Sequence, residues 1–320
     1  MRDRPSTSNC SSWAAIALLA VAVALLEWST PLPIAADSLA GIVAACGTLG
    51  GVTWFYRKVR PNEQFATMCT ALMQVLLFSA LGAILSYLVA RDDGPLWDDT
   101  FARWDRALGL DWLAFVRWID ARPWTVLPLR LAYASLIPQI ILIVVALGFT
   151  AKLAELRAVM FASILCGMIV ICVSGMVPAI SNFAYLGLTS ADFRHIDPWA
   201  GMVHMPDITA LREGTMQVIR LGEMQGIITF PSYHAGLSAV TLWGFWLTRI
   251  GWIRCPGMLL AAATIVATPV DGGHYFVDVF AGIAVAVGSI AVAGRAVRWA
   301  PALPRLTASP FRRSHAASAR

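Results

Sequence analysis

Long apolar stretches separated by polar connections run through most of this chain. A helix needs about 20 apolar residues to cover the roughly 30 Å of hydrocarbon in a bilayer. We predict a membrane helix in each of eight stretches: residues 12–28, 38–56, 64–90, 126–150, 155–178, 231–249, 255–270 and 273–294. The chain is therefore expected to be an all-α, polytopic helical membrane protein with about eight transmembrane helices.

The overall composition agrees with this pattern. Hydrophobic residues make up 58% of the 320 residues and charged residues only 13%, which excludes an ordinary soluble domain. The first stretch follows a charged start at residues 1–4, so it could be a signal peptide instead of a membrane helix. Because its apolar run is long and lacks a clean small-residue cleavage site, the sequence favours a retained helix.

The distribution of charge orients the predicted bundle. Lys and Arg are enriched in the cytoplasmic loops of membrane proteins. With the N-terminus inside, the inner segments hold Arg57, Lys58 and Arg60, and the outer segment 92–120 gathers aspartates. Residues 295–320 are expected to form a basic, disordered cytoplasmic tail against anionic lipid headgroups. The net charge of +5 is thus a topology signal, and because the basic residues are dispersed we expect no nucleic-acid partner.

The segment 92–123 is rich in tryptophan among alternating charges, with Trp97, Trp104, Trp112 and Trp118. Trp is favoured at the membrane interface, and we expect short amphipathic helices lying there. Two roles fit this segment: a structural cap over the bundle, or a lip that guides a lipid substrate. Arg130, in the next apolar stretch, either faces an aqueous interior or extends to the outer headgroups.

Two polar motifs each stand at the start of a predicted membrane helix. The first is Phe230-Pro-Ser-Tyr-His234, and the second is Gly273-His-Tyr-Phe-Val-Asp278. Ser232 suits the N-cap of the first helix. His274 and Asp278 are four residues apart, so on a helix they share one face and can touch. The apolar residues between the motifs suffice for one crossing and a return, which brings both motifs to the same, outer surface.

These residue types suit phosphoryl transfer. Asp278 can accept a hydrogen bond from one imidazole nitrogen of His274 and leave the other nitrogen nucleophilic. His234 can then protonate a departing alkoxide. Guanidinium groups and helix N-termini hold phosphate oxygens, and the candidates here are Arg212, Ser232 and the N–H groups around Gly272 and Gly273. The set predicts a reaction through a phosphohistidine, with no cofactor and no metal.

Two other classes of protein use similar residues. A zinc site needs ligands of the kind supplied by His204, His234, His274 and Asp278, but the sequence contains no local metal-ligand spacing such as His-Glu-x-x-His. A transporter would place charges near the middle of the bilayer on broken, repeated helices, whereas these motifs lie at one surface. The motifs therefore favour phosphoryl transfer over both.

The two motifs resemble the second and third signature motifs of the type 2 phosphatidic acid phosphatase superfamily. The resemblance extends to Leu108-Gly-Leu-Asp-Trp112, Tyr133-Ala-Ser135, Pro138-Gln139 and Leu211-Arg-Glu-Gly214, and looks closest to the inositol phosphorylceramide synthase-like branch. It implies a six-helix phosphatase-like core and a metal-independent mechanism. It also implies His274 as nucleophile, Asp278 as its partner and His234 as general acid.

One departure from the family pattern affects the expected function. The superfamily's first motif, a Lys followed six residues later by Arg-Pro, is absent, because Arg60-Pro61 and Arg122-Pro123 both lack a Lys at that spacing. We expect Arg212 to take over phosphate binding. Hydrolysis and phosphotransfer both stay open.

The expected protein is a multi-pass lipid phosphate phosphatase or phosphotransferase with its site on the outer face, in the inner membrane if the chain is bacterial. Its partners are membrane lipids, a lipid phosphate substrate and, for transfer, a lipid alcohol. Phosphatidate, a prenyl pyrophosphate, a sphingoid phosphate and phosphoinositol transfer to ceramide all fit. We divide the chain into N-terminal transmembrane helices at 1–61, a phosphatase or phosphotransferase-type membrane domain at 62–294 and the tail at 295–320.

Overall fold

The computed structural model describes residues 7–92 and 94–298, where the chain is helical apart from turns, loops and an isolated parallel β-bridge between Ile34 and Ile219. Within these residues, six helices are long and apolar enough to cross a membrane. They are α1 (Thr7–Ser29), α2 (Ala36–Lys58), α3 (Glu63–Val89), α8 (Leu153–Met176), α13 (Gly251–Asp271) and α14 (Phe276–Arg298). The chain is therefore a polytopic helical membrane protein, as the sequence predicts.

A bent pair of helices replaces the single helix predicted for residues 126–150. α6 (Pro123–Ala134) and α7 (Leu136–Phe149) meet at an angle of 56°, and counting them as one span raises the total to seven in the described residues. Pro138 explains the break, because its ring excludes the carbonyl four residues earlier, at Ala134, and it offers no N–H. Ser135 closes α6, since both its N–H and its hydroxyl donate to the carbonyl of Ala132.

The remaining predicted span is α12 (Tyr233–Thr248), which has only 16 residues. It ends at Arg249, whose φ of 56° is left-handed and does not continue a right-handed helix. α12 packs against α8, α13 and α14. It is therefore an inner helix of the bundle.

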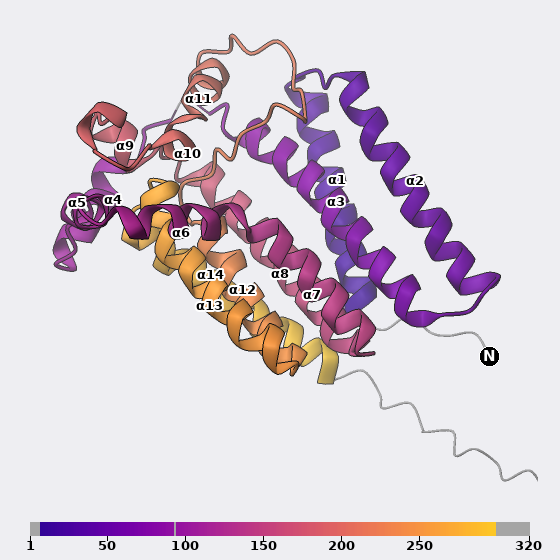
Figure 1. Cartoon of the computed structure of the whole chain (residues 1–320). Coiled ribbons are helices and arrows are strands. Elements are labelled where there is room, and N and C mark those ends of the chain that lie inside the picture. Colours follow the sequence, from indigo (N-terminus) through magenta and orange to yellow (C-terminus); the bar gives the residue numbers. More distant parts are fainter. Residues whose placement is uncertain (1–6, 93, 299–320) are drawn as a thin grey trace, which may run out of the picture.

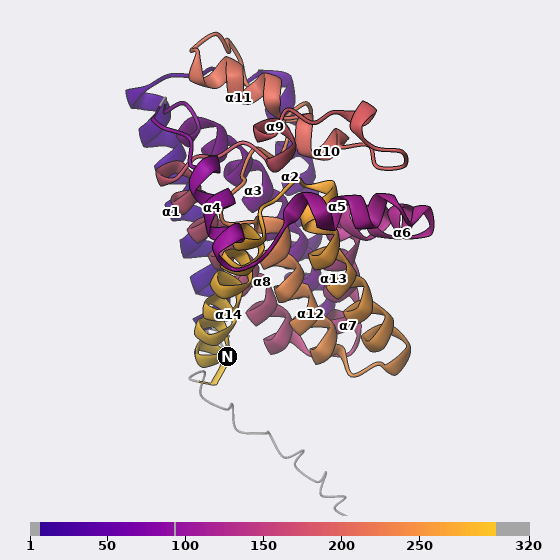
Figure 2. The same cartoon turned by 90° about the vertical axis from the view of Figure 1, so that its left-hand side faces the viewer.

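The shorter helices gather at one end of the bundle (Figure 1). They are α4 (Asp98–Ala107), α5 (Trp112–Asp120), α9 (Asn182–Tyr185), the 3-10 helix η1 (Ser190–Asp192), α10 (Trp199–Met202) and α11 (Met205–Arg212). The start of α1 and the end of α14 lie at the opposite end, and α6 runs across the bundle rather than along it (Figure 1, Figure 2). α12 and α14 both begin toward the end with the short helices, so both motifs face them.

Two buried apolar clusters hold the bundle together. The larger joins α7, α8, α12, α13 and α14, and it includes Ile143, Leu147, Leu156, Phe245 and Ala261. The other joins α1, α3, α8 and α11, and it includes Leu19, Leu85, Ile171, Leu211 and Ile219. Tyr233 packs against both clusters. The first motif thus lies where the two clusters meet.

The predicted tail begins later than residue 295. α14 continues through Arg298, because the Arg, Ala and Val residues at 295–298 extend the helix without a break. Residues 299–320 of the predicted tail lie outside the described residues.

Candidate active site

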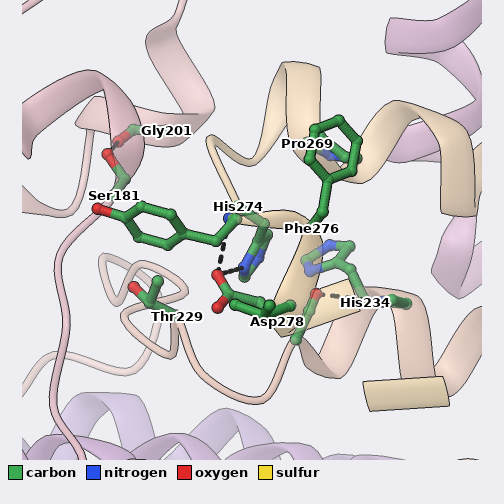
Figure 3. A network of polar contacts seen from close by, with 12 residues as sticks. Ser181, Gly201, Thr229, His234, Pro269, His274, Phe276 and Asp278 are labelled. Carbon is green, nitrogen blue, oxygen red and sulfur yellow. Dashed lines mark hydrogen bonds and ion pairs between the residues drawn. The ribbon is translucent and has the colours of Figure 1, made fainter. Parts of the chain in front are cut away.

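The two motifs meet at the N-terminal ends of α12 and α14. Ser232 is the N-cap of α12, as predicted: its backbone is extended, and its hydroxyl accepts a hydrogen bond from the N–H of Ala235 at 3.3 Å. Its own N–H donates to the carbonyl oxygen of Asp278 at 3.0 Å. His234 therefore lies in the first turn of α12, beside the turn that carries His274 (Figure 3).

His274 and Asp278 form the predicted pair. Nδ1 of His274 lies 3.3 Å from Oδ2 of Asp278 (Figure 3). α14 begins at Phe276, so His274 precedes the helix instead of lying on its face. The same Oδ2 accepts the N–H of Tyr275 at 2.9 Å, a reach-back that satisfies the open N-terminus of a helix. Asp278 is fully buried and His274 is 5% exposed, so the pair is shielded from water.

Burial and a neighbouring imidazole keep His274 uncharged. Removal from water, and then the proximity of His234, hold the pKa of His274 down at about 3. The ring is therefore neutral at physiological pH. With Nδ1–H directed at Asp278, Nε2 keeps its lone pair, which is what nucleophilic attack requires.

An aromatic partner from α6 holds His234. The ring of Tyr133 stacks on the imidazole, with centroids 4.2 Å apart and planes 8° from parallel. The hydroxyl oxygen of Tyr133 lies 3.5 Å from Nδ1 of His234. The bend after Ala134 turns α6 across the bundle and so brings Tyr133 over the imidazole. The ring plane of His234 is fixed, and Nε2 is the nitrogen left for proton transfer.

Two glycines let α12 and α14 approach closely. A Cβ on Gly236 would lie 2.9 Å from the carbonyl oxygen of Gly282, and a Cβ on Gly282 would fall against the carbonyl of Ser232. Small residues at such crossings allow helix backbones to touch. His234 and Asp278 each lie about one turn or less from this crossing. The glycine contact therefore sets the distance between the two motifs.

This constellation lies inside a region that matches a known family. The sequence pattern of the PAP2 superfamily matches residues 99–292, which is more than half of the chain. The chain belongs to the PAP2 superfamily. Comparison with curated proteins and with solved structures gave no match. The family match confirms the resemblance at the level of the superfamily and does not distinguish a branch within it.

The PAP2 region contains every predicted site residue, and in the structure the Arg212 side chain bonds to the backbone of another segment. Its guanidinium donates to the carbonyl oxygens of Asp92 at 2.8 Å and Gly94 at 2.7 Å. These bonds tie the end of α11 to the segment that follows α3. In the described part of the chain, no hydrogen bond or ion pair joins Arg212 to His234 or His274.

Gly273 is held in a conformation that favours glycine. Its φ is +65°, which is strained for residues with a Cβ. Its carbonyl accepts the N–H of Asn182 at 2.9 Å, and an added Cβ would lie 2.8 Å from the ring of Phe183. The start of α9 thus covers the turn immediately before His274.

Two carboxylates that are not among the predicted site residues contact the second motif of the PAP2 site. Asp98 and Asp105 of α4 are each 2% exposed and contact the residues that follow His274. With Phe101 and Ala102 they form the buried face of α4, at the spacing i, i+3, i+4, i+7 of a helix stripe. The sequence does contain a signal for this burial, because both acids occupy positions that share one helix face with Phe101 and Ala102.

The described residues do not form the ligand cluster that the zinc alternative requires. In residues 7–92 and 94–298, no three His, Cys, Asp or Glu side chains are grouped so that they can hold a metal ion. This includes His204, His234, His274 and Asp278. His204 is buried at 4% exposure, and burial lowers its pKa.

Proposed function

We propose that this PAP2 protein is an integral-membrane lipid phosphate phosphatase or phosphotransferase that works through a phosphohistidine. The observation that carries the proposal is the buried His274–Asp278 pair, at 3.3 Å, with His234 on the facing helix. Membership of the superfamily implies a phosphatase-type enzyme and phosphate-ester substrates. Both observations favour phosphoryl transfer over transport.

In the first proposed step, Nε2 of His274 attacks the phosphorus of the substrate. An N–P bond forms, the P–O bond to the leaving group breaks, and protonated His234 gives its proton to the leaving oxygen. Asp278 stabilises the positive charge that develops on His274, as the carboxylate of a triad does for its imidazole. The products of this step are a phosphohistidine and a free alcohol.

In the second step, neutral His234 accepts a proton from water or from a lipid alcohol. The acceptor oxygen attacks phosphorus, an O–P bond forms and the N–P bond breaks. His274 returns to its neutral form and His234 is protonated again for the next cycle. Water as acceptor gives a phosphatase, and a lipid hydroxyl gives a phosphotransferase.

We assign the phosphate oxygens to Arg212, the hydroxyl of Ser232 and the N–H of Gly273. Ser232 accepts the N–H of Ala235, which leaves its O–H free to donate to phosphate. Gly273 directly precedes the nucleophile. Arg212 has five N–H donors, and because two of its nitrogens bond the carbonyls of Asp92 and Gly94, phosphate binding there uses the other donors or a shifted side chain.

We also propose that the site faces outward, at the periplasmic or lumenal surface, with residues 62–294 as the enzyme domain. Headgroup transfer of the inositol phosphorylceramide synthase type is the second candidate. Its support is the missing Lys of the first family motif and the residues 108–112 and 133–135 that resemble that branch.

The purified protein in detergent, incubated with a panel of lipid phosphates with and without lipid alcohols, tests the proposal. Release of inorganic phosphate supports hydrolysis, and a new lipid phosphodiester or phosphomonoester supports transfer. Rapid quenching with a labelled substrate should trap an acid-labile, base-stable phosphoprotein that His274→Ala lacks. Turnover without any such intermediate would contradict the phosphohistidine.

A further inference from the structure

α4 presses two buried carboxylates against the turn that carries His274. Asp98 and Asp105 are both 2% exposed, although ionisable side chains are almost never fully buried unless they are paired. Neither forms an ion pair with a basic side chain in the part of the chain that the structure describes. Their partners are instead hydrogen-bond donors of the active-site turn and, for Asp98, also the N–H of Ile180.

Asp105 caps α14 from outside that helix. Its Oδ2 accepts the N–H of Phe276 and its Oδ1 accepts the N–H of Val277, each at 2.9 Å. These are among the N–H groups that a helix leaves without partners at its start. The residue at the N-cap position is Tyr275, whose side chain is a poor cap. Asp105 therefore supplies from α4 the cap that α14 itself lacks.

Asp98 fixes the residue next to the nucleophile. Its Oδ1 accepts the hydroxyl of Tyr275 at 2.9 Å, and its carboxylate also accepts the N–H of Ile180 at 3.1 and 3.2 Å. The ring of Tyr275 is fully buried. Because Tyr275 also donates its own N–H to Asp278, Asp98 holds the residue that lies between the two members of the pair.

The same helix reaches the motif that carries His234. Phe101, between the two acids, stacks on Phe230 with ring centroids 4.4 Å apart. It also packs against Tyr275 at 5.9 Å. One face of α4 thus contacts both motifs, so a shift of α4 would move them relative to each other.

We propose that Asp98 and Asp105 are positioning residues for phosphoryl transfer, which fix the turn from His274 to Asp278 so that the nucleophile faces His234. The inference rests on the proposed function. The acids do not touch the reacting atoms, and they act through Tyr275 and through the N-terminus of α14. Burial raises the pKa of both carboxylates above the usual value, and the hydrogen bonds from Ile180 and Tyr275 to Asp98, and from Phe276 and Val277 to Asp105, offset part of that rise.

The test removes acceptor oxygens with Asp105→Asn and Asp98→Ala, because the oxygen kept in Asp98→Asn still accepts both the Tyr275 hydroxyl and the Ile180 N–H. Asn keeps the shape of Asp but turns one acceptor oxygen into a donor, so in Asp105→Asn one of the two N–H groups of α14 loses its partner. Displacement of a catalytic group by about 1 Å can cost about 10²-fold in rate. We expect kcat of Asp98→Ala and Asp105→Asn to fall about 10²-fold while KM changes less than about threefold. Asp99→Asn is the matched control, because its side chain on the same helix is 65% exposed, and it should keep wild-type kcat.

A double-mutant cycle separates positioning from general destabilisation. Asp98→Ala and Tyr275→Phe remove the two ends of one hydrogen bond, so their combined loss of kcat should be smaller than the product of the two single losses. Fully multiplicative losses, or losses in KM with wild-type kcat, would overturn the inference.

Hydrogen exchange supplies a readout that needs no substrate. In Asp105→Asn, the peptide covering residues 274–279 should exchange faster, with and without orthovanadate, while the peptide covering α8 stays protected. Unchanged exchange in the 274–279 peptide would overturn the inference. The proposed chemistry can fail separately. If wild-type turnover proceeds without a trapped phosphohistidine while Asp98→Ala and Asp105→Asn still lose kcat, the positioning role stands and the phosphohistidine intermediate does not.

Discussion

Replacing Gly282 with Ala tests whether the crossing of α12 and α14 sets the active-site geometry. An added Cβ would lie 3.1 Å from the carbonyl carbon of Ser232 and nearer still to its oxygen, within the 3.0 Å that real Cβ atoms do not show. Both atoms belong to the backbone, so no side chain can rotate away. The two helices must separate or turn by roughly 1 Å, and such overpacking costs about 1–3 kcal/mol in a close-packed interior.

The displacement acts on the reacting groups. His234 follows Ser232 by two residues, and Asp278 precedes Gly282 by one helical turn. A shift of about 1 Å therefore changes the distance between His234 and His274 directly, and we expect kcat to fall about 10²-fold with KM altered less than about threefold.

The assay compares steady-state turnover of a lipid phosphate by variants that stay monodisperse in detergent. Gly288→Ala is the control, because it lies on the same helix and an added Cβ meets nothing within 4 Å. That change should be neutral or stabilise the helix by up to about 1 kcal/mol. Equal activity of the two alanine variants would refute the reasoning.

Three further predictions follow from the site and its surroundings. His274→Ala should abolish turnover of every substrate, whereas His234→Ala should keep part of its phosphoenzyme formation from an activated aryl phosphate, whose leaving group needs little protonation; label found only in His274→Ala would reverse the two roles. Vanadate should inhibit and EDTA should not, since the proposed steps use side chains alone; loss in EDTA that zinc restores would contradict them. Burial alone would raise the pKa of Asp120, but the N–H groups of residues 194–196 outweigh it and hold the pKa of that carboxyl below its usual value. Its stabilisation of the loop is therefore present above the unfolded pKa of about 3.9 and is lost as pH falls through the folded pKa. Corrected for the intrinsic pH dependence of exchange, the protection of the N–H groups of residues 194–196 should fall with acid in the wild type and be insensitive to it in Asp120→Asn, and an equal acid response in both would count against the assignment.

The membrane helices and the central pair are predictable from sequence because their signals are local. Apolar length indicates a span, and His274 and Asp278 are close in sequence, although they meet across the start of α14 and not on its face. The bend of α6 onto α7 depends on the clash that Pro138 makes with the preceding turn, which the apolar pattern of residues 126–150 conceals. The helical pattern also continues past residue 295, so composition alone places the end of α14 too early.

The contacts of α4 are not predictable in the same way. Asp105 and Phe276 are 171 residues apart in the sequence, and only the tertiary fold brings them together. Acidic residues in a loop usually indicate solvent exposure, yet Asp98 and Asp105 are buried. The hydrogen bonds of Arg212 to the carbonyls of Asp92 and Gly94 are not predictable either. In sequence, an arginine that binds backbone carbonyls looks the same as one that binds phosphate.

The bridge between Ile34 and Ile219 bears on how this protein can be divided. Two hydrogen bonds accompany it, from Ala35 N–H to the carbonyl of Ile219 at 2.9 Å and from Ile219 N–H to the carbonyl of Pro33 at 2.8 Å. They fasten the α1–α2 connection to the loop that leads into the first motif, while α1 also covers apolar faces of α3 and α8. Family likeness begins only at residue 99. A chimera or a minimal fragment of this protein therefore has to extend beyond the region of the family match and include α1.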